Sequence, residues 1–192
     1  DELLDSMLEG ISNMDYVRSE DIPNIELYMD QVTSFMDEQL SSSKRYDDDK
    51  ILTKTMINNY AKNNLLPPPV KKKYSKEHIL QMLLIYRLKQ TLSIQQIKGV
   101  MQSLGIQAEE KQHSEQIWKD LYAGYLNSRK TNGQILSDML EDLLKRIPDD
   151  SPESMAQLLL QLSWISYMTK RMCDVLVEKA FPLSEKEKKK EK

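Results

Sequence analysis

A short polar segment around residue 60 carries the side chains best suited to a binding role. Met56, Ile57 and Tyr60 recur at helical spacing and predict a helix over 53–64. At 100° per residue, the face opposite these apolar side chains carries only hydrogen-bonding groups. They belong to Lys54, Thr55, Asn58, Asn59, Lys62 and Asn63.

Asparagine and lysine together on one helix face suit duplex DNA. Asparagine can form two hydrogen bonds with adenine in the major groove, and lysine contacts phosphates. Asparagine also weakens a helix by roughly 0.6 kcal/mol relative to alanine. Asn58, Asn59 and Asn63 therefore need a compensating role. We interpret 53–64 as a recognition helix, and the alternative is a polar surface helix that happens to be rich in asparagine.

The charge of the chain is distributed unevenly. The formal net charge is -3, but residues 1–49 hold 14 acidic and 3 basic residues, whereas residues 50–76 hold 7 lysines and no acid. A basic segment of this kind attracts phosphate groups, and each contact is sensitive to salt. The segment includes the whole candidate recognition helix.

The basic segment ends in a loop that follows the candidate helix. The prolines at 67–69 end that helix, because proline cannot continue it and favours extended backbone in the preceding residue. We expect the loop to contact phosphates, and a solvated loop is the alternative. The residues concerned are Lys71, Lys72, Lys73 and Tyr74.

The stretch from Thr55 to Met101 resembles the DNA-binding domain of MerR-type regulators. In that family a recognition helix with an aromatic residue leads into a Gly-Leu-Leu-Pro turn, a basic wing that ends in tyrosine, a helix, and a Ser-Leu-x-x-Ile helix. The matching residues here are Tyr60, Leu65, Leu66, Pro67, Tyr74, Ser93, Ile94 and Ile97.

Three departures from the MerR pattern change what the resemblance implies. Asn64 replaces glycine in the turn, and asparagine tolerates the left-handed backbone required there. Asn58 replaces the phosphate-binding arginine of the family. The wing is reduced to a few lysines, so we expect no groove contacts from a full β-wing. The chain also resembles, over nearly its whole length, a bacterial family of unknown function, which implies a fold but no activity.

Helix-forming residues dominate the sequence, so we expect an all-α fold in which a helix-turn-helix precedes a C-terminal helical bundle. Ser93 with Gln96 forms a capping box, Gly105 closes the helix that follows, and Pro152 suits a first helical turn. The predicted helices span 2–11, 25–40, 53–64, 76–90, 94–104, 108–129, 134–147 and 152–181.

We expect a DNA-binding domain over 1–105, a bundle over 106–183 that dimerises or senses an effector, and a charged tail over 184–192. The apolar stripe of 152–181 predicts the central helix of the bundle, shared across a homodimer interface. Aromatic residues of this half could line a pocket for a small-molecule effector or fill the core. They are Trp118, Tyr122, Tyr125, Trp164 and Tyr167.

Catalytic and metal-binding patterns are missing from the sequence. His78 and His113 lie 35 residues apart, and Cys173 is the single cysteine. We therefore expect neither an enzyme nor a metal or cofactor site. We expect a cytoplasmic chain with no membrane partner. Its predicted function is sequence-specific binding of double-stranded DNA in transcription regulation. The alternative is a helical module that docks an acidic protein partner without binding DNA.

Overall fold

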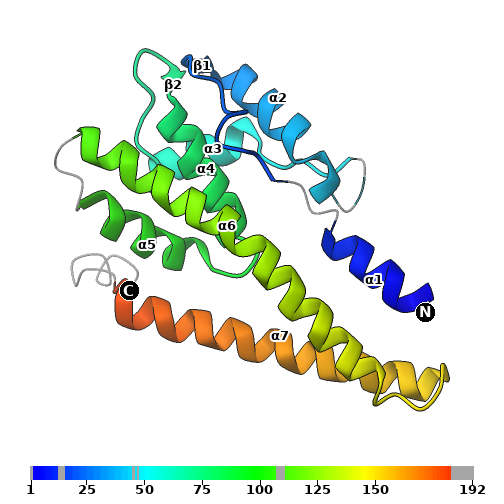
Figure 1. Ribbon diagram of the computed structural model, residues 1–192. Helices are drawn as coiled ribbons and strands as arrows, with labels where there is room; N and C mark the ends of the chain where they lie inside the picture. Colours follow the sequence, from blue (N-terminus) through cyan, green and yellow to red (C-terminus); the bar gives the residue numbers. More distant parts are fainter. Residues whose placement is uncertain (1, 13–15, 45, 47, 107–110, 183–192) are drawn as a thin grey trace.

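The structure is a computed structural model that describes residues 2–12, 16–44, 46, 48–106 and 111–182. This part of the chain is largely helical, as expected, with one small sheet (Figure 1). The elements are α1 (Glu2–Ser12), β1 (Leu27–Tyr28), α2 (Met29–Gln39), the short 3-10 turn η1 (Ser41–Ser43), α3 (Lys54–Lys62), β2 (Lys73–Tyr74), α4 (Lys76–Leu88), α5 (Ile94–Ile106), α6 (Lys111–Leu144) and α7 (Pro152–Ala180).

Helix α4 is the centre of the molecule. Its residues are buried on nearly every side, including Leu80, Met82 and Ile85, which have no accessible surface. The helix begins at a cap in which the Ser75 hydroxyl accepts from the backbone N–H of His78, and the His78 ring Nδ1 accepts from the N–H of Ser75 at 3.1 Å. Burial lowers the pKa of His78, which keeps the ring neutral and able to accept this bond.

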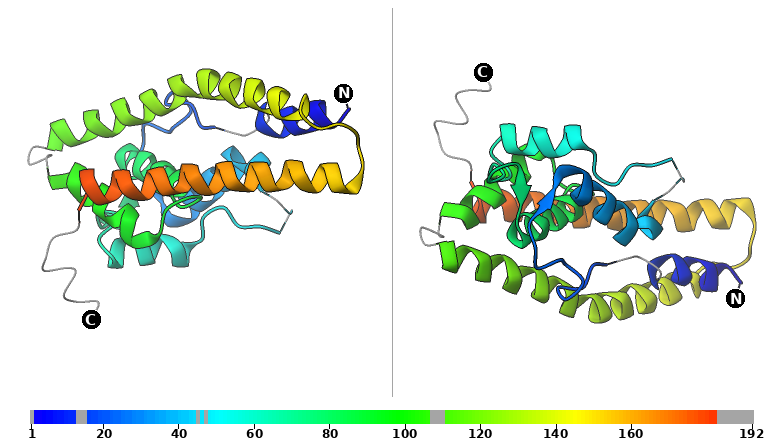
Figure 2. Two further views of the ribbon diagram at one scale, coloured as in Figure 1. Left: turned by 90° about the horizontal axis from the view of Figure 1, so that it is seen from below. Right: turned by 90° about the horizontal axis from the view of Figure 1, so that it is seen from above.

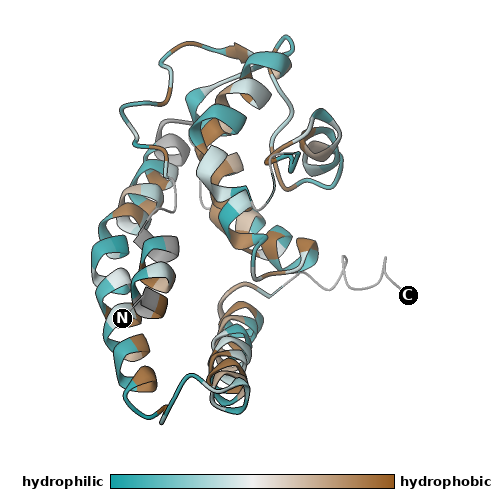
Figure 3. Ribbon diagram, turned by 90° about the vertical axis from the view of Figure 1, so that its right-hand side faces the viewer, coloured by the Kyte–Doolittle hydropathy of each residue, from teal (hydrophilic) through white to brown (hydrophobic). Residues whose placement is uncertain are grey.

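Two long helices, α6 and α7, flank this centre. Helix α6 contacts α4 and α1, and α7 contacts α5. The two helices are joined by the turn 145–151 and diverge from it, so that each covers a different side of the molecule (Figure 3). Leu140, Leu143 and Leu158 are buried close to this turn. None of the described helices combines the length and apolar character needed to cross a membrane.

Two predicted helix ends are wrong. The helices predicted over 108–129 and 134–147 are one continuous helix, α6, because packing along its length outweighs the roughly 1 kcal/mol penalty of Gly133 within it. Gly105 does not close its helix in a left-handed conformation, since α5 continues to Ile106 and none of the described glycines has a positive φ.

The helix over 152–181 is confirmed, and the Ser151 hydroxyl caps it by accepting from the N–H of Ser154 at 3.2 Å. Most of its side chains are exposed in the single chain, so its expected place at the centre of a bundle shared across a homodimer interface stays a prediction. Helix α2 begins at Met29, four residues later than predicted by sequence, since residues 27–28 form a strand. Ile25 and Tyr28 therefore lie outside the helix and are exposed.

The buried core crosses the boundary that we expected at residue 105. Trp118 and Tyr122 of α6 and Val177 of α7 belong to the same buried cluster as Ile57 of α3 and Leu80 of α4. The division into two domains stays a prediction. The expected tail over 184–192 and the side chain of His113 lie outside the described part of the chain.

Candidate nucleic-acid interface

Helix α3 is fixed to the core by its apolar face. Thr53 caps its start, since its hydroxyl accepts from the backbone N–H of Met56 at 3.2 Å. Ile57 and Tyr60 are buried, and Met56 is half-buried. The opposite side is exposed, as the helical spacing predicts. We call it the α3 polar face, and it consists of Lys54, Thr55, Asn58, Asn59, Lys62 and Asn63.

The members of the α3 polar face are not equally free to bind. The side-chain amide of Asn63 donates to the backbone carbonyl of Asn59 at 2.8 Å, so Asn63 stabilises the helix end. Lys54 forms an exposed ion pair with Asp30 of α2. Asn58 and Asn59 lie in the middle of the exposed side and are the residues best placed to contact an incoming ligand.

The turn after α3 holds the C-terminal end of the helix against the core. Asn64 has a left-handed φ of 58°, its N–H donates to Ala61 at 3.1 Å, and the N–H of Leu65 donates to the carbonyl of Tyr60 at 2.9 Å. These two bonds are those of a Schellman cap. Leu65 and Leu66 are buried. The expectation that Asn64 adopts the glycine-like conformation is confirmed.

A tight hairpin carries the lysines. Val70 and Lys73 exchange two backbone hydrogen bonds, of 3.1 and 2.9 Å, across the two-residue turn at Lys71 and Lys72. Both turn residues have a positive φ, 50° and 65° respectively, which is typical of a type I′ turn. We call residues 70–73 the lysine hairpin. The reduced wing expected from the sequence is therefore a folded turn, which the sequence did not reveal because neither central residue is asparagine or glycine.

The lysine hairpin is anchored to the rest of the fold by β2. This strand pairs antiparallel with β1, and the Lys73 ammonium lies 5.5 Å from the centre of the exposed Tyr28 ring. Tyr74 is only 3% exposed and packs edge-on against His78, with ring centres 5.6 Å apart. Burial also raises the pKa of its hydroxyl. Tyr74 thus anchors the hairpin to the core. The expectation that Tyr74 contacts phosphates at the surface is corrected, because its side chain is buried.

Charges around the candidate interface differ between its two ends. The N-terminal end of α3 borders a groove of about 710 Å³ against α2, in which Asp37, Asp48 and Asp49 balance the charges of Lys44, Lys50 and Lys54. The chain between Lys62 and Lys76 contains no acidic residue. An anion is therefore attracted to the C-terminal end of α3 and to the lysine hairpin rather than to the start of the helix.

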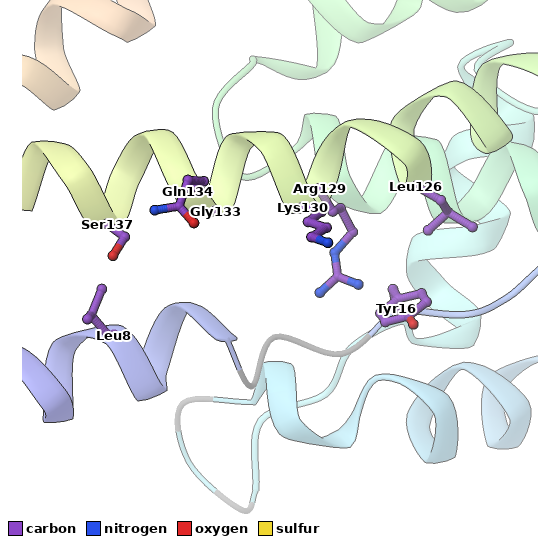
Figure 4. Close-up of a pocket in the computed structure, with 8 residues that line it drawn as sticks. All are labelled: Leu8, Tyr16, Leu126, Arg129, Lys130, Gly133, Gln134 and Ser137. Carbon is purple, nitrogen blue, oxygen red and sulfur yellow. The ribbon is translucent and has the colours of Figure 1, made fainter.

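The residues proposed for an effector pocket do not come together. Trp118 and Tyr122 are buried in the core, whereas Trp164 and Tyr167 are exposed on α7. A different cavity of about 520 Å³ lies between α1 and α6 (Figure 4). In it the Arg129 guanidinium lies 3.9 Å from the centre of the Tyr16 ring. The lining consists of Leu8, Tyr16, Leu126, Arg129, Lys130, Gly133, Gln134 and Ser137.

No group of three or more histidine, cysteine, aspartate or glutamate side chains with metal-binding geometry occurs within the described residues. His78 is buried beside the proline turn, and Cys173 is half-buried on α7. The structure thus places one set of binding groups predicted from the sequence on α3 and a second set on the lysine hairpin. Both α3 and β2 contact α2, which holds them in one unit.

The sequence profile of a family described as Domain of unknown function (DUF1836) matches residues 17–125. The match covers more than half of the chain, so the protein belongs to this family. Neither a curated protein nor a solved structure matches the chain. The expected resemblance to a family of unknown function is confirmed over the matched range, which contains α3, the lysine hairpin and α4. The resemblance to MerR-type regulators stays a prediction.

Proposed function

We propose that the protein is a sequence-specific DNA-binding transcription regulator that acts as a homodimer. The α3 polar face would lie in the major groove, with Asn58 and Asn59 on base edges. Lys62 and the lysine hairpin would contact the phosphates that flank the groove. The order of a recognition helix, turn, basic hairpin and two further helices is the one that the resemblance to MerR-type regulators implies.

The observation that carries this proposal is the backbone of Lys71 and Lys72. Residues other than glycine and asparagine adopt a left-handed φ at a cost of roughly 1 kcal/mol each, and here two lysines do so in succession. Asparagine and glycine would form the same turn with less strain. The turn thus sacrifices stability to expose two positive charges, which is expected of a phosphate contact and not of a simple connection.

The composition of α3 supports the same role. Asn58 and Asn59 are exposed, and each weakens the helix relative to alanine. A surface helix selected only for stability would carry alanine, glutamate or lysine at these positions. The two amides are therefore best explained as hydrogen-bonding groups for a ligand outside the chain.

One surface favours the alternative, a module that docks an acidic protein partner. Ile25, Tyr28 and Val70 are exposed beside the lysine hairpin. Ile25 and Val70 line a cavity of about 450 Å³ together with Lys73 and Lys76, and Glu26 and Glu77 belong to the same lining. Apolar and aromatic side chains beside positive charge are common in protein interfaces. In this alternative the lysines would bind carboxylates instead of phosphates.

Selection of bound sequences from a random duplex library distinguishes the two functions. The proposal expects enrichment of a motif that contains A·T pairs, and loss of that motif in an Asn58→Ala/Asn59→Ala variant that keeps the wild-type circular dichroism spectrum. A polyglutamate peptide serves as the acidic competitor. Binding of this peptide without enrichment of any duplex would overturn the proposal in favour of the acidic partner.

A further inference from the structure

Helix α7 leaves a large apolar surface uncovered. Leu160, Trp164 and Tyr167 are 70%, 64% and 59% exposed, and Met172 and Val175 are exposed as well. Seen from below, α7 lies in front of the molecule along its whole length, and no other described element covers it (Figure 2). The contact with α5 begins at the edge of this surface, where Asp174 accepts a hydrogen bond of 2.7 Å from Gln96, and continues on the adjoining side, where Val177 is buried.

Six residues along one side of α7, all of them exposed except the half-buried Met168, follow a palindromic spacing. Along one side of α7 the chain places side chains at intervals of four, three, one, three and four residues, so the pattern reads the same in both directions. Its midpoint lies between Tyr167 and Met168. We call these residues the α7 seam, and they are Leu160, Trp164, Tyr167, Met168, Arg171 and Val175.

From this spacing we infer that the α7 seam is an interface with a second copy of the chain, in which the two α7 helices pack antiparallel about a two-fold axis next to Tyr167. An antiparallel pair brings together residues whose numbers sum to 335. Leu160 of one copy then meets Val175 of the other, and Tyr167 meets Met168. A two-fold axis makes every such contact occur twice.

The contact that selects the antiparallel direction is between Trp164 and Arg171. In an antiparallel pair the Arg171 guanidinium of one copy faces the Trp164 ring of the other, an arrangement that is attractive. In a parallel pair in register, the two Arg171 side chains would face each other and repel. Within its own chain Arg171 pairs with Asp174, with N and O atoms 3.4 Å apart, and it remains half exposed.

The size of the surface fits a second copy. The exposed apolar side chains along the seam leave on the order of 500 Å² accessible, which is at the upper end of the largest patch of most monomeric proteins and supplies more than half of the ~800 Å² per partner of a stable interface. The seam includes a tryptophan, a tyrosine and an arginine, the residue types that contribute most to binding free energy in interfaces. The α7 seam would be the interface of the homodimer in the proposed function, on which this inference rests. The interface is formed by α7 and does not require DNA.

Sedimentation of the full chain without DNA tests the interface. We expect a dimer for the wild type and a dissociation constant raised at least about 100-fold by Trp164→Lys, because the new ammonium would be buried at the seam against the like charge of Arg171 in the other copy. Ser166→Lys is the matched control, since it adds the same charge at an exposed position outside the seam. A monomeric wild type, or equal weakening by both variants, would overturn the interface. Because no DNA is present, such a failure is distinguishable from a failure of DNA binding.

Cysteine cross-linking tests the direction of the helices, in chains that carry Cys173→Ser. Tyr167→Cys is expected to form a disulfide-linked dimer under mild oxidation. A mixture of Leu160→Cys and Val175→Cys chains should cross-link to each other and not to themselves. In the antiparallel pair, two copies of residue 160 are separated by 15 rises of 1.5 Å, or roughly 22 Å. Self-linking of Leu160→Cys, or no linking of Tyr167→Cys, would contradict the antiparallel seam.

Discussion

The hydroxyl of Tyr122 on α6 donates a buried hydrogen bond of 2.6 Å to the backbone carbonyl of Val17, 105 residues earlier in the chain. Val17 has no accessible surface, and Tyr122 has almost none. This bond attaches the segment that precedes β1 to the long helix that covers α4. It therefore helps to hold β1, and through β1 the lysine hairpin, in a fixed position.

Replacement of Tyr122 by phenylalanine tests this attachment. The variant would leave the Val17 carbonyl buried without its partner, so we expect the free energy of unfolding to fall by about 1 to 2 kcal/mol at pH 7. Urea denaturation measures the difference. Tyr125→Phe, at a half-buried neighbouring position, is the control and should change stability less. Equal effects of the two variants would show that the Val17 bond contributes little.

The same tyrosine predicts a dependence on pH. Burial raises the pKa of Tyr122 to about 12, above the ordinary value of 10 that it regains on unfolding. The stabilisation is then fully present below pH 10 and is lost as the pH rises from about 10 to about 12. We expect the difference in stability between wild type and Tyr122→Phe to shrink over this window. A difference that stays constant up to pH 12 would contradict the assignment.

The lysine hairpin predicts opposite changes in stability and DNA affinity. Lys71→Asn/Lys72→Gly fits the left-handed backbone better, so we expect the free energy of unfolding to rise by about 1 kcal/mol. Two phosphate contacts would be lost, and the slope of log affinity against log salt should decrease in magnitude by roughly 1.8. Thermal melts and duplex titrations measure the two effects. A variant that is more stable and binds DNA unchanged would show that the strain serves another purpose.

Helical spacing was sufficient to predict much of the candidate interface. The buried side of α3 and its exposed polar face follow directly from the 3.6-residue period, and the cap at Thr53 and the left-handed Asn64 follow from local side-chain chemistry. The hairpin was not predictable, because Lys71 and Lys72 are atypical of the turn that they form and only the pairing of β1 with β2 holds them there. Tyr74 looked like part of a basic loop, but tertiary packing buries it.

The long helices show a second limit of local patterns. The sequence predicted two helices, over 108–129 and 134–147, whereas packing against α1 and α4 keeps α6 continuous between them. The apolar stripe of 152–181 indicated a central helix, because a sequence pattern does not distinguish residues buried within one chain from residues that remain available to a second one. Only the structure shows that Trp164 is exposed and therefore available to a second chain.

The asparagines of α3 predict a separation between specificity and stability. Asn58→Ala or Asn59→Ala should weaken binding to the selected duplex by about 1 to 3 kcal/mol, and should slightly stabilise the helix. Asn63→Ala is the matched control. Because its amide is already bonded to the carbonyl of Asn59, we expect it to lower helix stability without changing the ratio of affinities for selected and scrambled duplexes. Similar loss of discrimination in all three variants would contradict the assignment of base contacts to Asn58 and Asn59.

The salt dependence of binding to a duplex tests the central claim most directly. A fluorescence titration of the full chain with duplex DNA between 50 and 200 mM salt measures it. If about four of Lys54, Lys62, Lys71, Lys72 and Lys73 reach phosphates in each protomer, log affinity per protomer should fall against log salt with a slope of roughly -3.6. A slope near zero, or no binding at the lowest salt, would contradict DNA binding by this surface.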